Sequence, residues 1–586
     1  MSGEKKFTAV IYFHGIGQQS RYEELSRLLE SFDDYSLVQE DNRLERFQVK
    51  VEPSRSDITN DNIGYVTFNR DGEEYRFYEV YWAPLTTTGT TGWGVFKWFI
   101  GHIFTPLTIW QSEWHTHRRL RISYLYSLWQ KLHPNSPQFI PLQKLIALYN
   151  DFCDEAMRGR KRDGKYSEFV KYLKSEAEND DKDGLLTLTH QWRRHMNRTE
   201  FWNFFVFLTI GYILTVVPIM TIGRILYLTF YELSFENFLS NDPLAIIFYV
   251  TLFLILPLPS LVARFLRDYV GDVQLWATYE ETSEKFAKRT EILKTGLETT
   301  THVLNHNGCE RVIFVSHSLG TTIAYDTLLT IGRHNRAIDN ASQFETDEAE
   351  PDNIRYLGTG GGGLPLPMTL SKNGEKIDTS NIRYFVTMGS PVDKIHYFFE
   401  SKSGLYRPFE LITDDIRGDI SSSPFARENG VPNFRWINFW SQEDYVSGAL
   451  YTPNPRKFTM REQAVNNVLI KSHHFPAPAR SHVGYFRHNT VIGLLYRLIF
   501  QRMDSNTTLM LKETVQARPQ VQGQTIRNVM LILTWTLLFA IVFDIMQLVL
   551  LYQIFSVVFM GLLSVILGAA IISLSRGALK PFKKGN

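Results

Sequence analysis

Short apolar runs separated by polar turns recur in two regions of the chain, and they predict strands that are buried on both faces of a sheet. The sequence FTAVIYF at 7–13 and the sequence VIFV at 312–315 are rich in β-branched and aromatic residues. The stretches at 21–32 and 283–306 have the length and the pattern of helices. The alternation of strands and helices predicts an α/β fold, with a mostly parallel sheet and helices on both faces.

More polar segments with strand character extend this sheet. The sequence YVTFNRDGEEYRFYEVYWAP at 65–84 predicts a β-hairpin around Asn69-Arg70-Asp71-Gly72, because Asp-Gly readily adopts the positive φ angles of a tight turn. FQVKVEP at 47–53 predicts a strand before this hairpin. Two later segments, 381–399 and 434–448, each begin with a strand and continue into a loop.

Three apolar blocks are much longer than any of these strands. Residues 201–223 and 243–263 carry no charged side chain, and residues 528–575 carry only Asp544. A helix of about 20 apolar residues is long enough to span a bilayer. The blocks therefore predict two spanning helices and a helical hairpin, about four transmembrane helices in all, with a buried core helix as the alternative for each.

Basic residues are concentrated on one side of these expected spans, as they are in cytoplasmic loops. The loop between the first two spans contains Arg224 as its only basic residue, and the outer flanks contain Arg193, Arg194, Arg198, Arg264, Arg267, Arg518, Arg527, Arg576, Lys580, Lys583 and Lys584. The pattern predicts a multi-pass membrane protein whose sheet domain and two termini face the cytoplasm. The aromatic segment at 93–110 predicts an interfacial segment, with a fifth span or a packed core helix as open alternatives.

The apolar blocks divide the chain into four parts. Residues 1–90 and 266–500 are expected to form the two halves of one α/β domain, and residues 91–265 a helical insertion that contains the first two spans. Residues 526–586 are expected to form a C-terminal transmembrane hairpin with a basic tail. The acidic, glycine-rich stretch at 342–367 lacks periodicity and predicts a loop, which leaves a role as a lid open.

Composition narrows the class of protein only slightly. The chain has 586 residues, more than one compact core usually holds, and its net charge of +1 gives no sign of nucleic-acid binding. Its two cysteines, Cys153 and Cys309, fit a reducing compartment. The N-terminal apolar run ends in His-Gly without a small-residue cleavage site, so it is interpreted as a first strand and not as a signal peptide.

A serine stands between the strand at 312–315 and the helix expected after it. The sequence there is Ser316-His317-Ser318-Leu319-Gly320. A serine at this boundary either caps the helix or acts as a nucleophile. The motif resembles G-x-S-x-G, the nucleophile elbow of the α/β-hydrolase superfamily, with Ser316 in place of the first glycine. This resemblance to the lipase-like serine hydrolases implies that Ser318 is the catalytic nucleophile.

The first expected strand ends in a second motif of that family. His14-Gly15-Ile16-Gly17 resembles the His-Gly loop of lipases and esterases, which contributes a backbone N–H to the oxyanion hole. By this resemblance the backbone N–H groups of Ile16 and Leu319 are expected to bind the oxyanion. The alternative is a glycine-rich turn without a catalytic role.

The order of catalytic residues along the family's sequences is serine, then acid, then histidine. By resemblance Asp444, after the strand that opens 434–448, is expected to be the acid, with Glu443 and Asp393 as alternatives. His482 lies in a Ser-His-x-x-Tyr pattern before a predicted helix and, by the same resemblance, is expected to be the base. The remaining histidines that could take this role are His473, His474 and His488.

Together these motifs predict a serine hydrolase of the lipase or esterase type. The expected reaction is hydrolysis of acyl esters of membrane (phospho)lipids through an acyl-enzyme, because a membrane-tethered catalytic domain lies next to that substrate. A thioesterase, an acyltransferase and a catalytically inactive membrane scaffold remain alternatives, since fold alone does not define function. The expected partners are the bilayer and its lipids, without nucleic acid, and neither a metal nor a cofactor is indicated.

Overall fold

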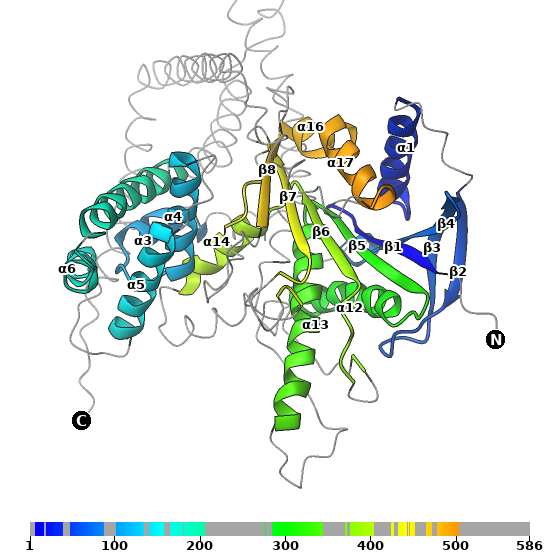
Figure 1. Ribbon diagram of the computed structural model, residues 1–586, viewed down its shortest axis with the longest axis horizontal. Helices are drawn as coiled ribbons and strands as arrows, with labels where there is room; N and C mark the ends of the chain where they lie inside the picture. The colour runs from blue at the N-terminus through cyan, green and yellow to red at the C-terminus, as the bar shows by residue number, and fades with distance from the viewer. Residues whose placement is uncertain are drawn as a thin grey trace, which may run out of the picture. The chain divides into compact units, whose positions relative to one another are not determined.

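A mixed sheet of eight strands, in the order β2-β3-β4-β1-β5-β6-β7-β8, organises the fold (Figure 1). The strands are β1 (Phe7–Phe13), β2 (Gln48–Pro53), β3 (Asn62–Arg70), β4 (Glu73–Val80), β5 (Cys309–His317), β6 (Ile382–Met388), β7 (Arg435–Ser441) and β8 (Val465–Ile470). The computed structural model describes residues 6–502 except 17–18, 39–46, 87–100, 103, 134–139, 158–164, 180, 205–275, 277–283, 344–369, 372–374, 404–423, 427–431, 442–443, 445, 452–464 and 471–477.

Six neighbouring strands, from β4 to β8, form the parallel part of the sheet. Every residue of β1 is buried, and so is every residue of β5 except Glu310, which explains why both sequences are apolar without alternation. The strands expected at 7–13 and 312–315 are therefore confirmed. Because these strands are parallel, the C-terminal ends of β1, β5, β6 and β7 lie at the same edge of the sheet.

The other part of the sheet is antiparallel. β3 pairs with β4 through a tight hairpin, and β2 pairs with β3 at the edge. Asp71 and Gly72 in the turn have positive φ angles of 52° and 81°, the conformation for which the Asp-Gly pair is suited. The predicted hairpin is thus confirmed.

Helices cover both faces of the sheet (Figure 1). On one face α1 (Glu23–Val38) and α17 (Asn489–Phe500) pack against the alternate residues Val10 and Tyr12 of β1. On the other face α12 (Glu284–Leu304) and α13 (Gly320–Gln343) pack against Ile11 and Phe13. Successive strand residues point to opposite faces, so each face of β1 contributes to a different core. The α/β fold with a mostly parallel sheet is confirmed.

The remaining described helices include a group with a core of its own. It comprises α3 (Thr105–Gln111), α4 (Arg118–Leu132), α5 (Ile140–Met157), α6 (Tyr166–Glu176) and the helical residues 182–204. Trp114, Tyr149 and Trp192 are buried in this core. The fully buried guanidinium of Arg121 donates to the carbonyl oxygens that end α3, including those of Ile109 and Ser112, and so satisfies the last turn of that helix.

The expectation of about four transmembrane helices is contradicted. Within the described part of the chain, no helix combines the length and the apolar character that crossing a bilayer requires. The spans expected at 201–223, 243–263 and 528–575 lie outside the described residues, except for 201–204 at the end of a helix rich in charged residues. The fold class is corrected to an α/β fold with a mostly parallel mixed sheet. The predicted multi-pass localisation with cytoplasmic termini depended on these spans, so it is contradicted as well.

The structure describes only part of two other segments for which the sequence made predictions. The segment 93–110 is described at 101–102 and 104–110, and its last part forms α3, whose Pro106 and Ile109 are buried. The loop expected at 342–367 lies outside the described residues beyond Gln343. The expected interfacial segment and the possible lid therefore stay predictions.

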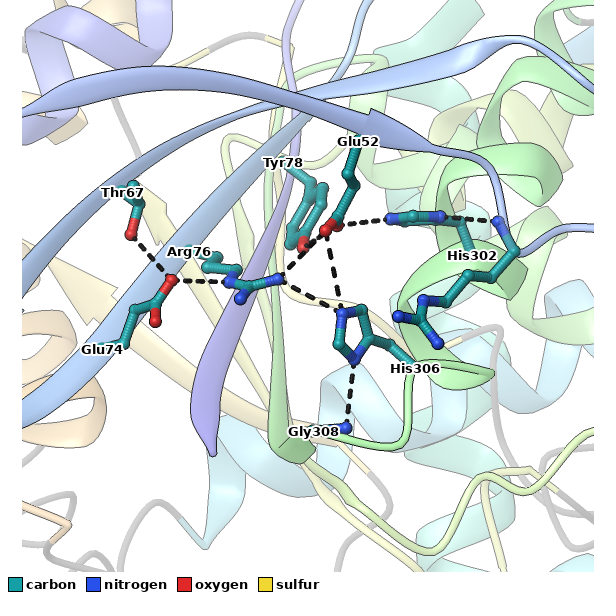
Figure 2. A network of polar contacts seen from close by, with 9 residues as sticks. Glu52, Thr67, Glu74, Arg76, Tyr78, His302, His306 and Gly308 are labelled. Atoms are coloured by element: carbon teal, nitrogen blue, oxygen red, sulfur yellow. Dashed lines mark hydrogen bonds and ion pairs between the residues drawn. The ribbon is translucent and has the colours of Figure 1, made fainter. Parts of the chain in front are cut away.

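A network of charged and polar side chains connects the edge strand β2 to β4 and α12 (Figure 2). Arg76 on β4 donates to Glu52 on β2 at 3.2 Å and to Glu74 at 2.8 Å. Glu52 also accepts from the Tyr78 hydroxyl at 3.0 Å and lies 2.9 Å from Nε2 of His302. Because Nδ1 of His302 accepts the backbone N–H of Arg55, its Nε2 carries the proton and donates to Glu52. Burial opposes ionisation of Glu52, but these donors lower its pKa to about 2.

We expect Glu52→Gln to lower the free energy of unfolding at pH 7 by about 2 kcal/mol, because the amide leaves the Arg76 cation with weaker compensation. The folded-state pKa of Glu52 lies below its ordinary value of 4.5, so the charged carboxylate contributes stability above that pH. This contribution is lost as the pH falls from about 4.5 toward about 2. The difference between wild type and variant should therefore be smaller at pH 3 than at pH 7 in urea unfolding.

Glu310→Gln is the matched control, because Glu310 forms an exposed ion pair with Lys6. Such pairs contribute little to stability. An equal loss in both variants, or a Glu52→Gln difference that does not change between pH 7 and pH 3, would contradict the role of this network.

Candidate active site

The serine turn connects β5 to α13 at the C-terminal edge of the sheet. Ser318 has a positive φ angle of 52°, a left-handed conformation that non-glycine residues seldom adopt. Its backbone N–H donates to the carbonyl oxygen of Met388 at the end of β6 (2.9 Å). This sharp strand-to-helix turn has the geometry of a nucleophile elbow. The hydroxyl points to His482 and not to the first turn of α13, so its geometry is not that of a helix cap.

Ser318, His482 and Asp444 form a continuous hydrogen-bonded chain. Nε2 of His482 lies 2.8 Å from Oγ of Ser318, and Nδ1 lies 2.9 Å from Oδ2 of Asp444. Asp444 follows β7, and His482 lies in the short helix α16 (Pro478–Val483). The structure thus brings together the three side chains that the sequence singled out, and their catalytic role stays a prediction.

Four donors surround the Asp444 carboxylate. Oδ1 accepts the backbone N–H groups of Val446 (2.9 Å) and Ser447 (3.2 Å), and Oδ2 accepts the Tyr485 hydroxyl (2.8 Å) besides His482. Burial opposes ionisation, but the hydrogen bond and charge of His482, together with the other donors, hold the pKa of Asp444 well below its usual range. The carboxylate therefore stays charged and accepts a hydrogen bond from Nδ1–H of His482.

This arrangement defines the protonation state of His482. A carboxylate only accepts hydrogen bonds, so the proton of the neutral imidazole is on Nδ1 and the free electron pair of Nε2 faces the Ser318 hydroxyl. Burial lowers the pKa of His482, although Asp444 opposes this effect. The imidazole is therefore neutral near pH 7 and is oriented to accept the serine proton.

The rival acid and base candidates have other positions. Asp393 lies in the first turn of α14 (Val392–Ser403), and its Oδ2 accepts the backbone N–H of Tyr451 at 2.8 Å. His488 is the residue that precedes α17. Glu443, His473 and His474 lie outside the described residues.

The loop after β1 packs directly against the serine turn. A Cβ atom on Gly15 would lie 3.0 Å from Cβ of Ser318, and one on Gly320 would lie 2.3 Å from the carbonyl oxygen of His14. Only glycine allows this approach at both positions. His14 in the same loop contacts Trp82: its ring stacks on the Trp82 ring at 4.8 Å, and its Nε2 accepts the Trp82 backbone N–H.

The expected oxyanion donors belong to these two neighbouring segments. Leu319 is buried directly after Ser318, and Ile16 is partly buried in the loop beside it. A third close glycine, Gly389, has a positive φ angle of 63°, and a Cβ there would lie 3.1 Å from Cε1 of His482. The backbone is thus closely packed around the triad, while binding of an oxyanion by Ile16 and Leu319 stays a prediction.

Three residues near Ser318, His482 and Asp444 were assigned no role from the sequence. Tyr485 donates to Asp444, and it is the tyrosine of the Ser-His-x-x-Tyr pattern that singled out His482. His317 is the second residue of the serine motif, and its Nε2 lies 3.0 Å from the carbonyl oxygen of His482. Glu24 on α1 lies 3.7 Å from Nδ1 of His317, and no sequence pattern pointed to it.

No metal site accompanies these residues in the part of the chain that the structure describes: no group of three or more His, Cys, Asp or Glu side chains there could hold a metal ion. The thiols of Cys153 and Cys309 are free and buried. Burial raises the pKa of both thiols to about 12, so neither is an activated nucleophile.

Comparison of the chain with models of protein families, with curated proteins and with solved structures gave no match. Three features of the site bear on its chemistry. They are the strained serine, the hydrogen-bonded histidine and carboxylate, and the glycine loop that packs against the serine.

Proposed function

We propose that the chain is a serine hydrolase that cleaves carboxylic acyl esters through an acyl-enzyme intermediate. The proposal is supported above all by the hydrogen-bonded chain from Ser318 through His482 to Asp444, with distances of 2.8 and 2.9 Å. The positive φ angle of Ser318 and the glycine loop beside it add to this support. The same features correspond to the lipase-like members of the α/β-hydrolase superfamily, which the sequence motifs resemble.

In the first half of the proposed reaction, Oγ of Ser318 attacks the ester carbonyl carbon and His482 Nε2 takes the hydroxyl proton. Asp444 stabilises the imidazolium that forms, and the backbone N–H groups of Ile16 and Leu319 bind the negative oxygen. The imidazolium then gives its proton to the leaving alkoxide as the ester C–O bond breaks. The acyl group remains on Ser318 and the alcohol leaves.

In the second half, water takes the place of the alcohol. His482 accepts a proton from the water as its oxygen attacks the acyl carbon, and the same proton returns to Oγ of Ser318 when the acyl–serine bond breaks. The products are the free acid and the original serine. The complete set of triad contacts argues against a catalytically inactive scaffold.

The substrate is proposed only as a carboxylic acyl ester. The more specific expectation, an ester of a membrane (phospho)lipid, depended on the predicted transmembrane helices. Because these helices are contradicted, the substrate is not narrowed to a lipid. Esterases, thioesterases and acyltransferases use the same triad chemistry. A substrate series is therefore the experiment that defines the class.

Purified full-length chain should release p-nitrophenol from p-nitrophenyl acyl esters in a rapid burst of about one equivalent per chain, because acylation of Ser318 precedes slower deacylation. Stopped-flow absorbance on the butyrate, octanoate and palmitate esters measures both phases. A matched series of acyl thioesters and an added alcohol acceptor would show whether a thioesterase or an acyltransferase outcome dominates. Folded chain without turnover of any ester or thioester would refute the proposal.

A further inference from the structure

Behind the triad lies a buried ion pair that the proposed mechanism does not use. Nδ1 of His317 lies 3.7 Å from Oε2 of Glu24, and both side chains are at least nine-tenths buried. His317 ends β5 immediately before the nucleophile, and Glu24 lies in the first turn of α1. The pair therefore links the serine turn to a helix on one face of the sheet.

The Glu24 carboxylate also holds the loop that carries the expected oxyanion donor. Its Oε2 accepts the backbone N–H of Gly15 at 3.1 Å and the hydroxyl of Tyr12 at 2.8 Å, and its Oε1 accepts Nε2 of Gln19 at 2.6 Å. Gly15 immediately precedes Ile16. A change in the position of Glu24 would therefore be transmitted directly to the loop.

The imidazole of His317 lies between two acceptors. Its Nε2 lies 3.0 Å from the carbonyl oxygen of His482, which only accepts, so Nε2 must carry a proton. Its Nδ1 faces the Glu24 carboxylate, which only accepts as well, so a proton on Nδ1 is also favoured. The geometry therefore indicates a charged imidazolium whose ring centroid is 5.1 Å from that of His482.

We propose that the Glu24–His317 ion pair is a positioning element of the active site, which holds the backbone of His482 and the Gly15 loop and keeps His482 in its basic form at low pH. The inference rests on the proposed function, since it assigns His482 the role of the base. Neither residue touches the reacting atoms in this account, so both are positioning residues.

The other titratable groups that face His317 are compatible with its charge. They are His14 at the end of β1, Asp444 after β7, His482 in α16 and Tyr485 in the turn η4 (Gly484–Arg487). Burial lowers the pKa of His317, but the nearby Glu24 carboxylate, 3.7 Å from Nδ1, opposes this effect and the net shift is upward. Burial likewise opposes ionisation of Glu24, whose donors lower its pKa to about 2. Burial lowers the pKa of His14, so that ring adds no second cation.

The pair affects the pH range in which His482 is a base. Burial is the main cause that lowers the pKa of His482, and the His317 cation lowers it further, with a larger effect than the opposing charge of Glu24. A lower pKa leaves the imidazole neutral down to a lower pH. Removal of the cation should therefore raise the pKa of His482. The acid limb of the pH profile of kcat/KM, where activity falls as His482 is protonated, should then move to higher pH.

Two substitutions separate the charge of His317 from its hydrogen bond. His317→Gln keeps an N–H donor for the carbonyl oxygen of His482 but carries no charge, whereas His317→Ala has neither. We expect the acid limb of kcat/KM for p-nitrophenyl butyrate to move up by about one pH unit in both variants. At the high-pH plateau we expect His317→Gln to stay within about tenfold of wild type and His317→Ala to fall by about a hundredfold, because a small displacement of the base is costly.

His306→Gln is the control, since His306 is a buried histidine in the network of Figure 2 that binds the backbone of Gly308 away from the triad. We expect it to keep the wild-type pH profile. Burst amplitudes count the active chains in each preparation, so a partly misfolded variant does not distort the rates. If neither His317 variant folds, Glu24→Gln takes their place: both charges of the pair are then lost, and a smaller upward shift of the limb is expected.

The outcomes of this experiment are distinct. Wild-type turnover with an unshifted acid limb and an unchanged plateau in the pair's variants would overturn the inference and leave the proposed function intact. Absence of any turnover by folded wild-type chain would refute the proposed function itself. An upward shift in the variants of the pair but not in His306→Gln would support the inference.

Discussion

Ser318→Ala should reduce ester turnover by a factor on the order of 10⁶, because the variant has no oxygen that can form the acyl-enzyme. The remaining activity would come only from the oxyanion donors and from substrate binding. Alanine keeps the Cβ atom at the positive φ angle of Ser318, so the backbone of the turn is equally strained in both proteins. The measurement is kcat/KM for p-nitrophenyl butyrate, with thermal unfolding as the test of folding.

Ser316→Ala provides the matched control two residues away. The Ser316 hydroxyl donates to the carbonyl oxygen of Val386 at 3.0 Å within the sheet, so its loss costs about 1 kcal/mol of stability and little activity. Full turnover by purified Ser318→Ala, or an equal loss in both variants, would be incompatible with a serine nucleophile at position 318.

Loss of the base or of its orienting acid should be almost as severe. We expect His482→Ala to be nearly as damaging as Ser318→Ala and the double variant to be little worse, because the residues of a triad act as one unit. We expect Asp444→Asn to lower kcat by about a thousandfold or more, since an amide at this position no longer holds the proton on Nδ1 of His482. Steady-state kinetics of the three variants at the pH optimum tests these expectations.

Asp393→Asn distinguishes the two candidate acids that the structure describes. Oδ2 of Asp393 accepts the backbone N–H of Tyr451, and an asparagine side-chain oxygen can accept the same bond. We expect kcat to change by less than about tenfold. A severe loss in Asp393→Asn together with a mild one in Asp444→Asn would move the acid to the end of β6 while leaving the serine hydrolase proposal in place.

Sequence patterns were most informative where one local physical cause determines the structure. β1 was predictable because a strand buried on both faces needs apolar residues at every position. The β3–β4 turn was predictable because Asp71 and Gly72 adopt the positive φ angles that this turn requires. The three members of the proposed triad were chosen by resemblance to family motifs and chain order, and the geometry that joins them was not contained in any local pattern.

Other features depend on contacts between distant parts of the chain. β8 was missed because Asn466 and Asn467 interrupt its apolar pattern, although Asn467 bonds both backbone groups of Leu450. Glu24 was missed because its partner His317 is 293 positions further along the chain, the difference between the two residue numbers. Long apolar runs were interpreted as spans from their length and their lack of charged side chains, and no helix of the described residues supports that interpretation.

The most direct test of the central claim is covalent labelling with a fluorophosphonate, which reacts rapidly only with an activated serine. The purified full-length chain is incubated with the probe, its intact mass is measured, and the adduct is located by peptide mass spectrometry. Our account predicts one phosphonyl group per chain, attached to Ser318 and formed more slowly below the pKa of His482. An unlabelled folded chain, or an adduct on a serine other than Ser318, would contradict it.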